Sequence, residues 1–268
     1  MKTGFIGVGN MATAMINGML SADEKMINNL YLYDISTEKT AKFVEKGAHT
    51  VPSIAELYKN CDAVVLSVKP QNFPEVLAEL AAAKDDRRVL FISIGAGITT
   101  KTVSDALGGV PVVRALPNTP MLIGKGVSAV CRNSLVNDAE YDFACSIFES
   151  AGKIIKIDEN EMNRIISVTS SSPAYVFMFI KAICDGATAQ GLDGDALRIA
   201  VCNTVTGAAE LLETSGKSAD ELIAMVSSKG GTTERATVEL RRLGFEEAII
   251  SAMQKCTDRA DELGKATK

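Results

Sequence analysis

The sequence contains no tryptophan and a single histidine, His49, among its 268 residues. Histidine is the side chain that most readily moves protons near neutral pH. His49 falls in a connection with no partner evident in the sequence, so we expect it at the surface. Any proton chemistry of this chain must therefore proceed without a histidine or depend on this one.

The sequence also lacks closely spaced cysteine pairs, runs of basic residues and long runs of apolar residues. The six cysteines show no CxxC spacing, which favours buried free thiols in a reducing compartment and gives no metal-binding pattern. A net charge of -5 without a basic run argues against a nucleic-acid partner. No run approaches the ~18 apolar residues of a membrane span, and the chain begins on a strand pattern without a signal peptide. We therefore expect a cytoplasmic protein with no metal, nucleic-acid or membrane partner.

The chain has two halves of different periodicity. Its length, with 47% hydrophobic and 23% charged residues, suits one large globular domain or two smaller ones. Apolar strands alternate with helical patterns up to residue 158, as in a parallel sheet with crossover helices; the strands are expected at residues 3–6, 29–34, 61–68, 88–94, 111–116 and 153–157. Helical periodicity then predominates, at residues 161–190, 196–213, 219–226, 232–243 and 246–263. We predict an α/β chain, with a Rossmann-type parallel-sheet domain over residues 1–158 and an all-α dimerisation domain over residues 159–268.

A glycine pattern follows the first predicted strand. Gly7 and Gly9, with Ala12 in the third position, match the dinucleotide fingerprint GxGxxG/A. Gly7 would allow a tight turn, Gly9 a close approach of the pyrophosphate, and Ala12 close packing of the helix on the strand. The pattern alone is weak evidence, but here it lies between a predicted strand and a predicted helix.

The second predicted strand ends in an acid, Asp34, 25 residues after Gly9. This spacing is close to that of the carboxylate that binds the adenosine ribose diol, and such an acid would repel the 2′-phosphate of NADPH. Asp34 therefore predicts a preference for NADH. The alternative is a turn or N-cap aspartate before the helix expected at residues 37–46.

Two polar stretches interrupt the helical half. Ser170-Ser171-Ser172-Pro173 must kink the first helix, and both a packing role and a ligand-facing role remain open for it. The loop of residues 227–233, Ser-Ser-Lys-Gly-Gly-Thr-Thr, leads into a helix. If Thr232 starts that helix, its free amides would suit a carboxylate or phosphate; the alternative is an ordinary turn with a threonine N-cap.

Over essentially its full length the chain resembles the pyrroline-5-carboxylate reductase family. The most specific features are the proline-rich loop, the Ser-Pro-Ala-Tyr kink and the Gly-Gly-Thr-Thr loop, in this order and spacing. The matching stretches are Phe5-Ile6-Gly7-Val8-Gly9-Asn10-Met11, Val68-Lys69-Pro70, Arg114-Ala115-Leu116-Pro117-Asn118-Thr119-Pro120, Ser171-Ser172-Pro173-Ala174-Tyr175-Val176-Phe177, Gly230-Gly231-Thr232-Thr233, and the tail Gly244-Phe245 with Met253-Gln254-Lys255-Cys256. The resemblance implies an oxidoreductase that reduces 1-pyrroline-5-carboxylate to L-proline with NAD(P)H, the final step of proline biosynthesis.

The resemblance also implies roles for particular residues. The pyrophosphate would be held by Gly7, Gly9, Asn10 and Met11. The nicotinamide half would be surrounded by Val68, Lys69, Pro70, Ala96 and Asn118. The carboxylate of the imino-acid substrate would be bound by Ser228, Gly231, Thr232 and Thr233, and the Thr233 hydroxyl would contact the ring nitrogen and so serve catalysis. The family forms intertwined homodimers, often assembled into rings of dimers.

Three departures from the family pattern bear on these expectations. Lys229 stands where a proline is usual, Thr169-Ser170-Ser171 replaces a glycine-containing Ser-Gly-Ser, and Asp34 replaces the neutral polar residue of many NADPH-preferring members. The family background thus favours NADPH, whereas Asp34 favours NADH. Two other functions remain open: a hydroxy-acid dehydrogenase, for which Lys181 is the one lysine on the long helix, and a nucleotide-sensing protein without catalysis.

Overall fold

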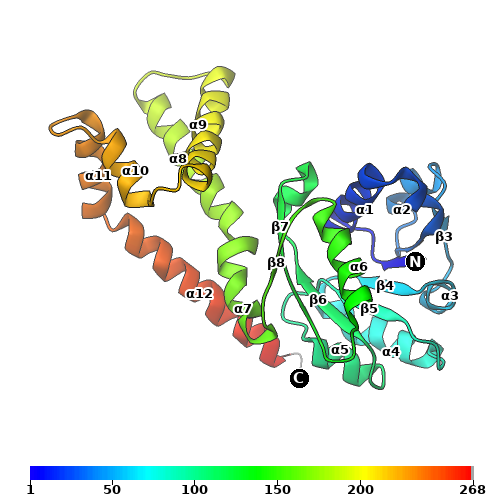
Figure 1. Ribbon diagram of the computed structural model, residues 1–268. Coiled ribbons are helices and arrows are strands. Elements are labelled where there is room, and N and C mark those ends of the chain that lie inside the picture. The colour runs from blue at the N-terminus through cyan, green and yellow to red at the C-terminus, as the bar shows by residue number, and fades with distance from the viewer. Residues whose placement is uncertain (267–268) are drawn as a thin grey trace. The chain divides into compact units, whose positions relative to one another are not determined.

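The computed structural model describes residues 1–266 and contains two compact units (Figure 1). Unit 1 comprises Met1–Ser171 together with Cys256–Lys268, and unit 2 comprises Ser172–Lys255. Packing thus divides the chain at Ser171, later than the predicted boundary at residue 158. The reason is that Met162 is fully buried against Leu116 and Cys131, which makes the segment after residue 158 part of the core of unit 1.

Unit 1 is built on an eight-stranded sheet in the order β3-β2-β1-β4-β5-β6-β7-β8. The six strands from β3 to β6 in this order are parallel to one another, in the arrangement of a doubly wound nucleotide-binding domain whose strand order reverses between β1 and β4. The strands are β1 (Thr3–Ile6), β2 (Leu30–Tyr33), β3 (His49–Thr50), β4 (Ala63–Leu66), β5 (Leu90–Ser93), β6 (Val112–Leu116), β7 (Gly126–Arg132) and β8 (Gly152–Lys156). The six predicted strands are confirmed within a few residues at their ends.

The parallel sheet predicted from the sequence is confirmed, with one antiparallel strand, β7, added to it. This strand was not predicted, and it pairs antiparallel with β6, while β8 follows β7 in parallel. Parallel neighbours need a crossover of about a dozen residues or more. Only residues 117–125, with the short 3₁₀ helix η3 (Thr119–Ile123), separate β6 from β7, so the chain must turn back on itself.

Helices cover both faces of the sheet (Figure 1). On one face α1 (Asn10–Ala22) and α6 (Asp138–Glu149) bury Met15 and Phe148. On the other face α3 (Ile54–Asn60), α4 (Phe73–Ala83) and α5 (Thr100–Ala106) form a second apolar cluster. The remaining short elements are η1 (Glu24–Asn29), α2 (Glu38–Val44), η2 (Pro70–Asn72) and η4 (Glu159–Glu161). Because both faces are covered, the central strands are near-continuous apolar runs, as predicted.

The predicted interruption near Pro173 is present as a π-helical turn. The chain passes through α7 (Met162–Ile165) and the π-helix η5 (Ile166–Ser170) into α8 (Ser172–Ala189). The Ser171 amide donates to the Ile166 carbonyl at 2.8 Å, a bond five residues back along the chain. Pro173 lacks an amide hydrogen, and the wider turn before it accommodates the resulting break; π-turns of this kind are frequent at functional sites.

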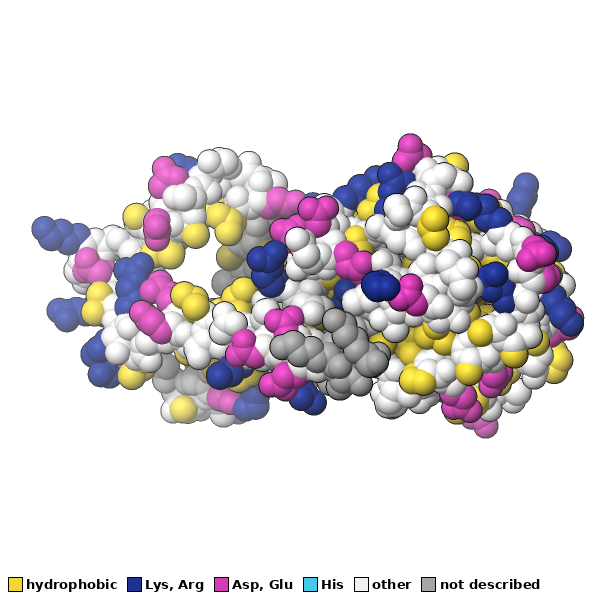
Figure 2. Space-filling model, turned by 90° about the horizontal axis from the view of Figure 1, so that it is seen from below, with side chains coloured by type: hydrophobic (Ala, Val, Ile, Leu, Met, Phe, Trp, Pro, Cys, Tyr) yellow, Lys and Arg dark blue, Asp and Glu magenta, His cyan; other side chains and the backbone are white. Residues whose placement is uncertain are grey.

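Unit 2 is helical, as predicted, and leaves many apolar side chains exposed. It contains α8, α9 (Asp195–Thr214), α10 (Ala219–Val226), α11 (Thr232–Arg242) and the first part of α12 (Phe245–Ala266). Phe177 is 62% exposed and Met178 is 71% exposed. Figure 2 shows apolar side chains at the surface among charged ones of both signs. Exposed apolar area of this extent marks an interaction surface.

One stretch of the described chain, Glu159–Ala189, is long and apolar enough to cross a membrane by length and composition alone. Only 6% of its most apolar window is buried within the chain. A helix that is apolar on much of its surface needs a nonpolar environment, and a second protein chain supplies one as well as a lipid bilayer does.

Candidate active site

The turn after β1 has a conformation and a close backbone contact that require glycine at position 7. Gly7 adopts φ +90°, and a Cβ at this position would lie 2.9 Å from the Ser67 carbonyl oxygen. The Gly7 amide donates to the Tyr33 carbonyl at 2.8 Å. Gly9 is the N-cap of α1, which has no side-chain cap, and a Cβ there would meet nothing within 4 Å. The amino end of α1 therefore has space and free backbone donors for an anionic group.

Ser67 is part of the candidate site, and the sequence analysis missed it. Its hydroxyl donates to the carbonyls of Gly7 at 2.6 Å and Ile6 at 3.0 Å, which joins the end of β4 to the glycine turn. The available signal was a polar side chain at the carboxyl end of an otherwise apolar strand.

Asp34 is tied to the same turn. Its carboxylate accepts hydrogen bonds from the amides of Val8 at 2.7 Å and Ser36 at 2.9 Å, and from the Lys39 ammonium at 3.1 Å. Burial alone would raise the pKa of Asp34, but these hydrogen bonds outweigh it and hold the pKa below its usual value of 3.8. The carboxylate is therefore ionised at neutral pH, and it aligns the glycine turn in addition to its predicted role as a ribose ligand.

A cavity of about 530 Å³ opens where the strand order reverses, the place where doubly wound sheets bind ligands. Its volume falls in the usual range for cofactor pockets. Of the predicted cofactor residues, Gly7, Gly9, Asp34, Val68 and Lys69 line it. The lining also includes Lys39, Ser67, Glu75 and Glu79, which the sequence analysis did not select.

The other predicted cofactor residues lie at the amino end of α1 or after the carboxyl ends of parallel strands. Asn10 and Met11 are the first residues of α1. Pro70 begins η2 after β4, and Ala96 is exposed in the loop after β5. Asn118, after β6, is 7% exposed. Their cofactor contacts remain predictions.

The side chain of Asn118 connects three segments of unit 1. It donates to the Thr169 carbonyl in the π-helix at 2.9 Å and accepts from the Val127 amide in β7 at 2.9 Å. Asn118 thus joins the proline-rich loop to the π-helix and to the antiparallel strand. Any contact that it makes with a cofactor must be compatible with these bonds.

In unit 2, helix α11 begins at Thr232, with Gly231 as its N-cap and no side-chain cap. The alternative of a threonine N-cap is therefore wrong, and the first amides of the helix remain available to an anion. A Cβ at Gly231 would lie 2.9 Å from the Ser228 carbonyl oxygen, so a larger residue here would displace the backbone of the turn. Thr232 is exposed, and Thr233 is half-buried in the first turn.

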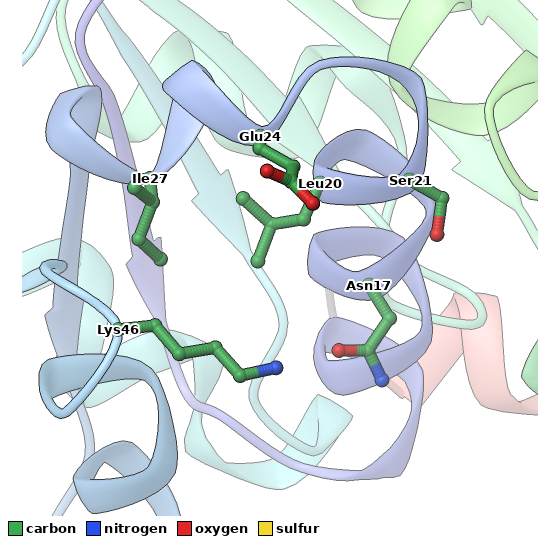
Figure 3. Close-up of a pocket in the computed structure, with 6 residues that line it drawn as sticks. All are labelled: Asn17, Leu20, Ser21, Glu24, Ile27 and Lys46. Carbon is green, nitrogen blue, oxygen red and sulfur yellow. The ribbon is translucent and has the colours of Figure 1, made fainter.

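A second cavity, of about 570 Å³, lies away from the glycine turn (Figure 3). It is lined by Asn17, Leu20, Ser21, Glu24, Ile27 and Lys46. In Figure 3 the Lys46 side chain extends toward Asn17 of α1, and the apolar side chains of Leu20 and Ile27 lie to one side of it. None of the predicted cofactor residues lines this cavity, so we assign the cofactor to the cavity at the strand reversal.

Other reactive side chains have ordinary structural surroundings. His49 is exposed, stacks on Tyr31 with ring centroids 4.7 Å apart, and contacts the Asn28 carbonyl. Burial raises the pKa of the Cys61 and Cys131 thiols to about 12. Within the described part of the chain, no three His, Cys, Asp or Glu side chains gather as a metal site would require.

The fold and the cavity at the strand reversal define a dinucleotide-binding protein with a helical second domain. Residues 2–97 match the family model described as NADP oxidoreductase coenzyme F420-dependent, and residues 159–263 match the model described as pyrroline-5-carboxylate reductase dimerisation. The second match starts immediately after the boundary predicted from the sequence.

Full-length relatives carry the same family name. The chain is 33% identical to a pyrroline-5-carboxylate reductase of Escherichia coli, covering 99% of both chains, and 31% identical to one of Corynebacterium melassecola, covering 97% of both. A solved reductase structure from Coxiella burnetii superposes with a TM-score of 0.89 at 31% identity, covering 98% of both chains. One from Plasmodium falciparum, solved with NADP bound, has a TM-score of 0.89 at 28% identity and the same coverage. The chain belongs to the pyrroline-5-carboxylate reductase family, and it is an oxidoreductase that uses a nicotinamide cofactor and self-associates through a dimerisation domain.

Proposed function

We propose that this chain reduces 1-pyrroline-5-carboxylate to L-proline by hydride transfer from NAD(P)H to the carbon of the C=N bond. The observation that carries the proposal is the full-length 33% identity to the Escherichia coli reductase in a chain whose glycine turn opens on a cavity of cofactor size. The bound nicotinamide supplies the hydride. Because the ring nitrogen of the imine can already be protonated, no histidine is needed.

The roles of the protein are binding and alignment. The amino end of α1, with Gly9, Asn10 and Met11, holds the pyrophosphate. Val68, Lys69, Pro70, Ala96 and Asn118 surround the nicotinamide half. The uncapped first turn of α11 receives the substrate carboxylate, with Ser228, Gly231, Thr232 and Thr233 around it. The Thr233 hydroxyl is the hydrogen-bond partner of the ring nitrogen.

We propose NADH as the preferred cofactor. The cavity is lined by three acids, Asp34, Glu75 and Glu79, and by two lysines, Lys39 and Lys69. Lys39 is already paired with Asp34 at 3.1 Å. The excess of negative charge disfavours an added 2′-phosphate, whereas the Asp34 carboxylate suits a ribose diol. Lys39 is half exposed. If NADPH binds, the positive charge of Lys39 is the group that would contact its 2′-phosphate.

The active unit is proposed to be an intertwined dimer, with the cofactor domain of one chain completed by the α11 loop of the other. The exposed apolar side chains of α8 to α12 and the match to a dimerisation domain support this arrangement. We propose further that several of these dimers can assemble into a ring. The apolar stretch Glu159–Ala189 would then be covered by protein in the cytoplasm, with no membrane involved.

The test is a spectrophotometric assay with purified protein, 1-pyrroline-5-carboxylate, and either NADH or NADPH. We expect oxidation of the reduced cofactor that depends on the imine, with a higher kcat/KM for NADH, and L-proline as the product. No oxidation above background with either cofactor would refute the reductase function. Oxidation of both cofactors with equal efficiency would refute only the proposed cofactor preference.

The two alternative functions have weaker support. A hydroxy-acid dehydrogenase would use Lys181 as its acid, but this lysine is paired with Asp185 on the helix surface, and the hydrogen bond from the lysine to Asp185 raises the pKa of Lys181 above its usual value. A nucleotide-sensing protein would bind cofactor without turnover. The same assay separates both from the reductase, because neither predicts oxidation of NADH that depends on the imine.

A further inference from the structure

The side chain of Glu234 is bonded to the loop that precedes its own helix. Its carboxylate oxygen Oε2 accepts a hydrogen bond from the Gly230 amide at 2.6 Å. Glu234 is the third residue of α11 and is half-buried. Hydrogen bonds to an ionised carboxylate are shorter and stronger than those between neutral groups, so this contact restrains the loop.

The backbone that this contact restrains is the most flexible part of the loop. Gly230 adopts φ +74°, a left-handed conformation, and Gly231 follows it directly. Two consecutive glycines lose more conformational freedom on ordering than any other pair. Lys229 before them does not restrict φ as a proline would. The loop therefore needs side-chain contacts to hold a single conformation.

Two hydrogen bonds hold the loop in one conformation. The Gly231 amide donates to the Ser228 carbonyl at 2.9 Å, which closes a turn over residues 228–231. The bond from Gly230 to Glu234 then fixes this turn to the first turn of α11. The Gly230 amide is thereby satisfied within the chain, while the amides of Thr232 and Thr233 stay at the uncapped end of the helix.

We infer that Glu234 is a positioning residue for the substrate carboxylate, which it aligns by holding Gly230 and thus the orientation of the free amides beside it. This inference rests on the proposed reductase function. The negative charge of Glu234 also has an opposite effect, since it lies in the same helix turn as the proposed carboxylate site and would repel the substrate. Its bond to Gly230 offsets part of that charge, and the inference is that alignment outweighs repulsion.

The two effects predict opposite changes in KM. If alignment dominates, Glu234→Ala raises the KM for 1-pyrroline-5-carboxylate about tenfold, the change expected for loss of one charge-assisted hydrogen bond. The KM for the nicotinamide cofactor should stay within about twofold, because the cofactor is bound by the glycine turn of unit 1. Glu234→Gln keeps an oxygen acceptor for the Gly230 amide and should recover most of the wild-type KM.

A matched control lies on the same helix. Glu239 forms an exposed pair with Arg242, so Glu239→Ala removes a carboxylate from α11 without affecting the loop. Its KM values should equal those of the wild type. An unchanged or lower KM for the imine in Glu234→Ala would overturn the inference, and so would a Glu234→Gln variant as impaired as Glu234→Ala.

Failure of the reductase function would be distinguishable from failure of this inference. A wild-type chain that oxidises no cofactor would refute the function alone. Calorimetric binding of L-proline, which carries the same carboxylate, would then test Glu234 directly. About tenfold weaker binding to Glu234→Ala than to the wild type would support the positioning role, and equal affinity would overturn it.

Discussion

The carboxylate of Glu159 lies 3.6 Å from the guanidinium of Arg114, an arginine that is only 1% exposed in β6. The same carboxylate accepts hydrogen bonds from the amide and the hydroxyl of Thr100 at the start of α5. Arg114 also donates to Asn163 at 3.2 Å. Glu159 therefore joins the middle of the sheet, a surface helix and the segment that leads into α7.

Removing this carboxylate should destabilise unit 1 strongly. Glu159→Ala leaves the buried charge of Arg114 without its ionic partner, which typically costs about 3 kcal/mol. Urea denaturation followed by circular dichroism would measure the loss in the free energy of unfolding. Glu239→Ala, which breaks an exposed pair, should cost no more than about 0.5 kcal/mol. Equal losses in the two variants would contradict the structural role assigned to Glu159.

The cofactor preference should respond to Asp34 and Lys39 in opposite directions. Asp34→Ser removes the diol ligand and a negative charge, so we expect the KM for NADH to rise more than the KM for NADPH. Lys39→Ala removes the nearest positive charge and should instead raise the KM for NADPH more. Steady-state kinetics with both cofactors would give the ratios. A ratio that both substitutions leave unchanged would exclude the assigned roles.

The contribution of Asp34 to stability should depend on pH with a definite sign. Because hydrogen bonds hold its pKa below 3.8 in the folded chain, the ionised form stabilises the fold, and this stabilisation is lost as the pH falls through the lowered pKa. Asp34→Asn should reduce the free energy of unfolding by about 1–3 kcal/mol at pH 7. The difference from the wild type should shrink below about pH 4.

The exposed acid Asp105, which pairs with Lys101 on α5, provides the control for this titration. Asp105→Asn should change the free energy of unfolding by no more than about 0.5 kcal/mol at neutral pH. Urea denaturation at several pH values would compare the three proteins. A difference between Asp34→Asn and the wild type that grows toward low pH would contradict the lowered pKa.

Thr233 should act on the imine and not on the cofactor. Thr233→Ala removes the proposed partner of the ring nitrogen, and the expected cost is about 1–3 kcal/mol of transition-state stabilisation, or roughly 5- to 150-fold in kcat/KM for the imine. The dissociation constant for NADH, measured by fluorescence, should not change. Thr237→Ala is the matched control, because that hydroxyl donates to the Glu234 carbonyl of its own helix at 3.0 Å. Equal effects of the two substitutions would refute a specific role for Thr233.

Much of unit 1 could be predicted because its signals are local. The apolar strand before Gly7 and the helix after Gly9 identify the glycine turn, and Asp34 stands at the end of its strand as expected. The antiparallel strand β7 was missed, although the short connection of residues 117–125 already excludes a parallel crossover. Residues 126–132 were not recognised as a strand, so neither β7 nor its antiparallel direction was predicted.

The bonds that hold the candidate site were not predictable, because they join residues distant in sequence. The Ser67 hydroxyl bonds to Gly7, 60 residues away, and Asn118 bonds to Thr169, 51 residues away. Neither pair has a local pattern. Each depends on which segments the fold brings together, and packing of the whole domain decides that.

The sequence by itself determined that an α/β half is followed by a helical half. It also determined the glycine turn and the loop of residues 227–233, because turn residues and periodicity act over a few positions. The helix start at Thr232 was predicted, but only the folded structure decided that Gly231 is its N-cap, that no side chain caps it, and that Glu234 accepts from the Gly230 amide. It also decided that Asp34 holds the glycine turn through the Val8 amide. These outcomes depend on distances of about 3 Å between specific donors and acceptors, which residue order does not specify until the backbone has folded.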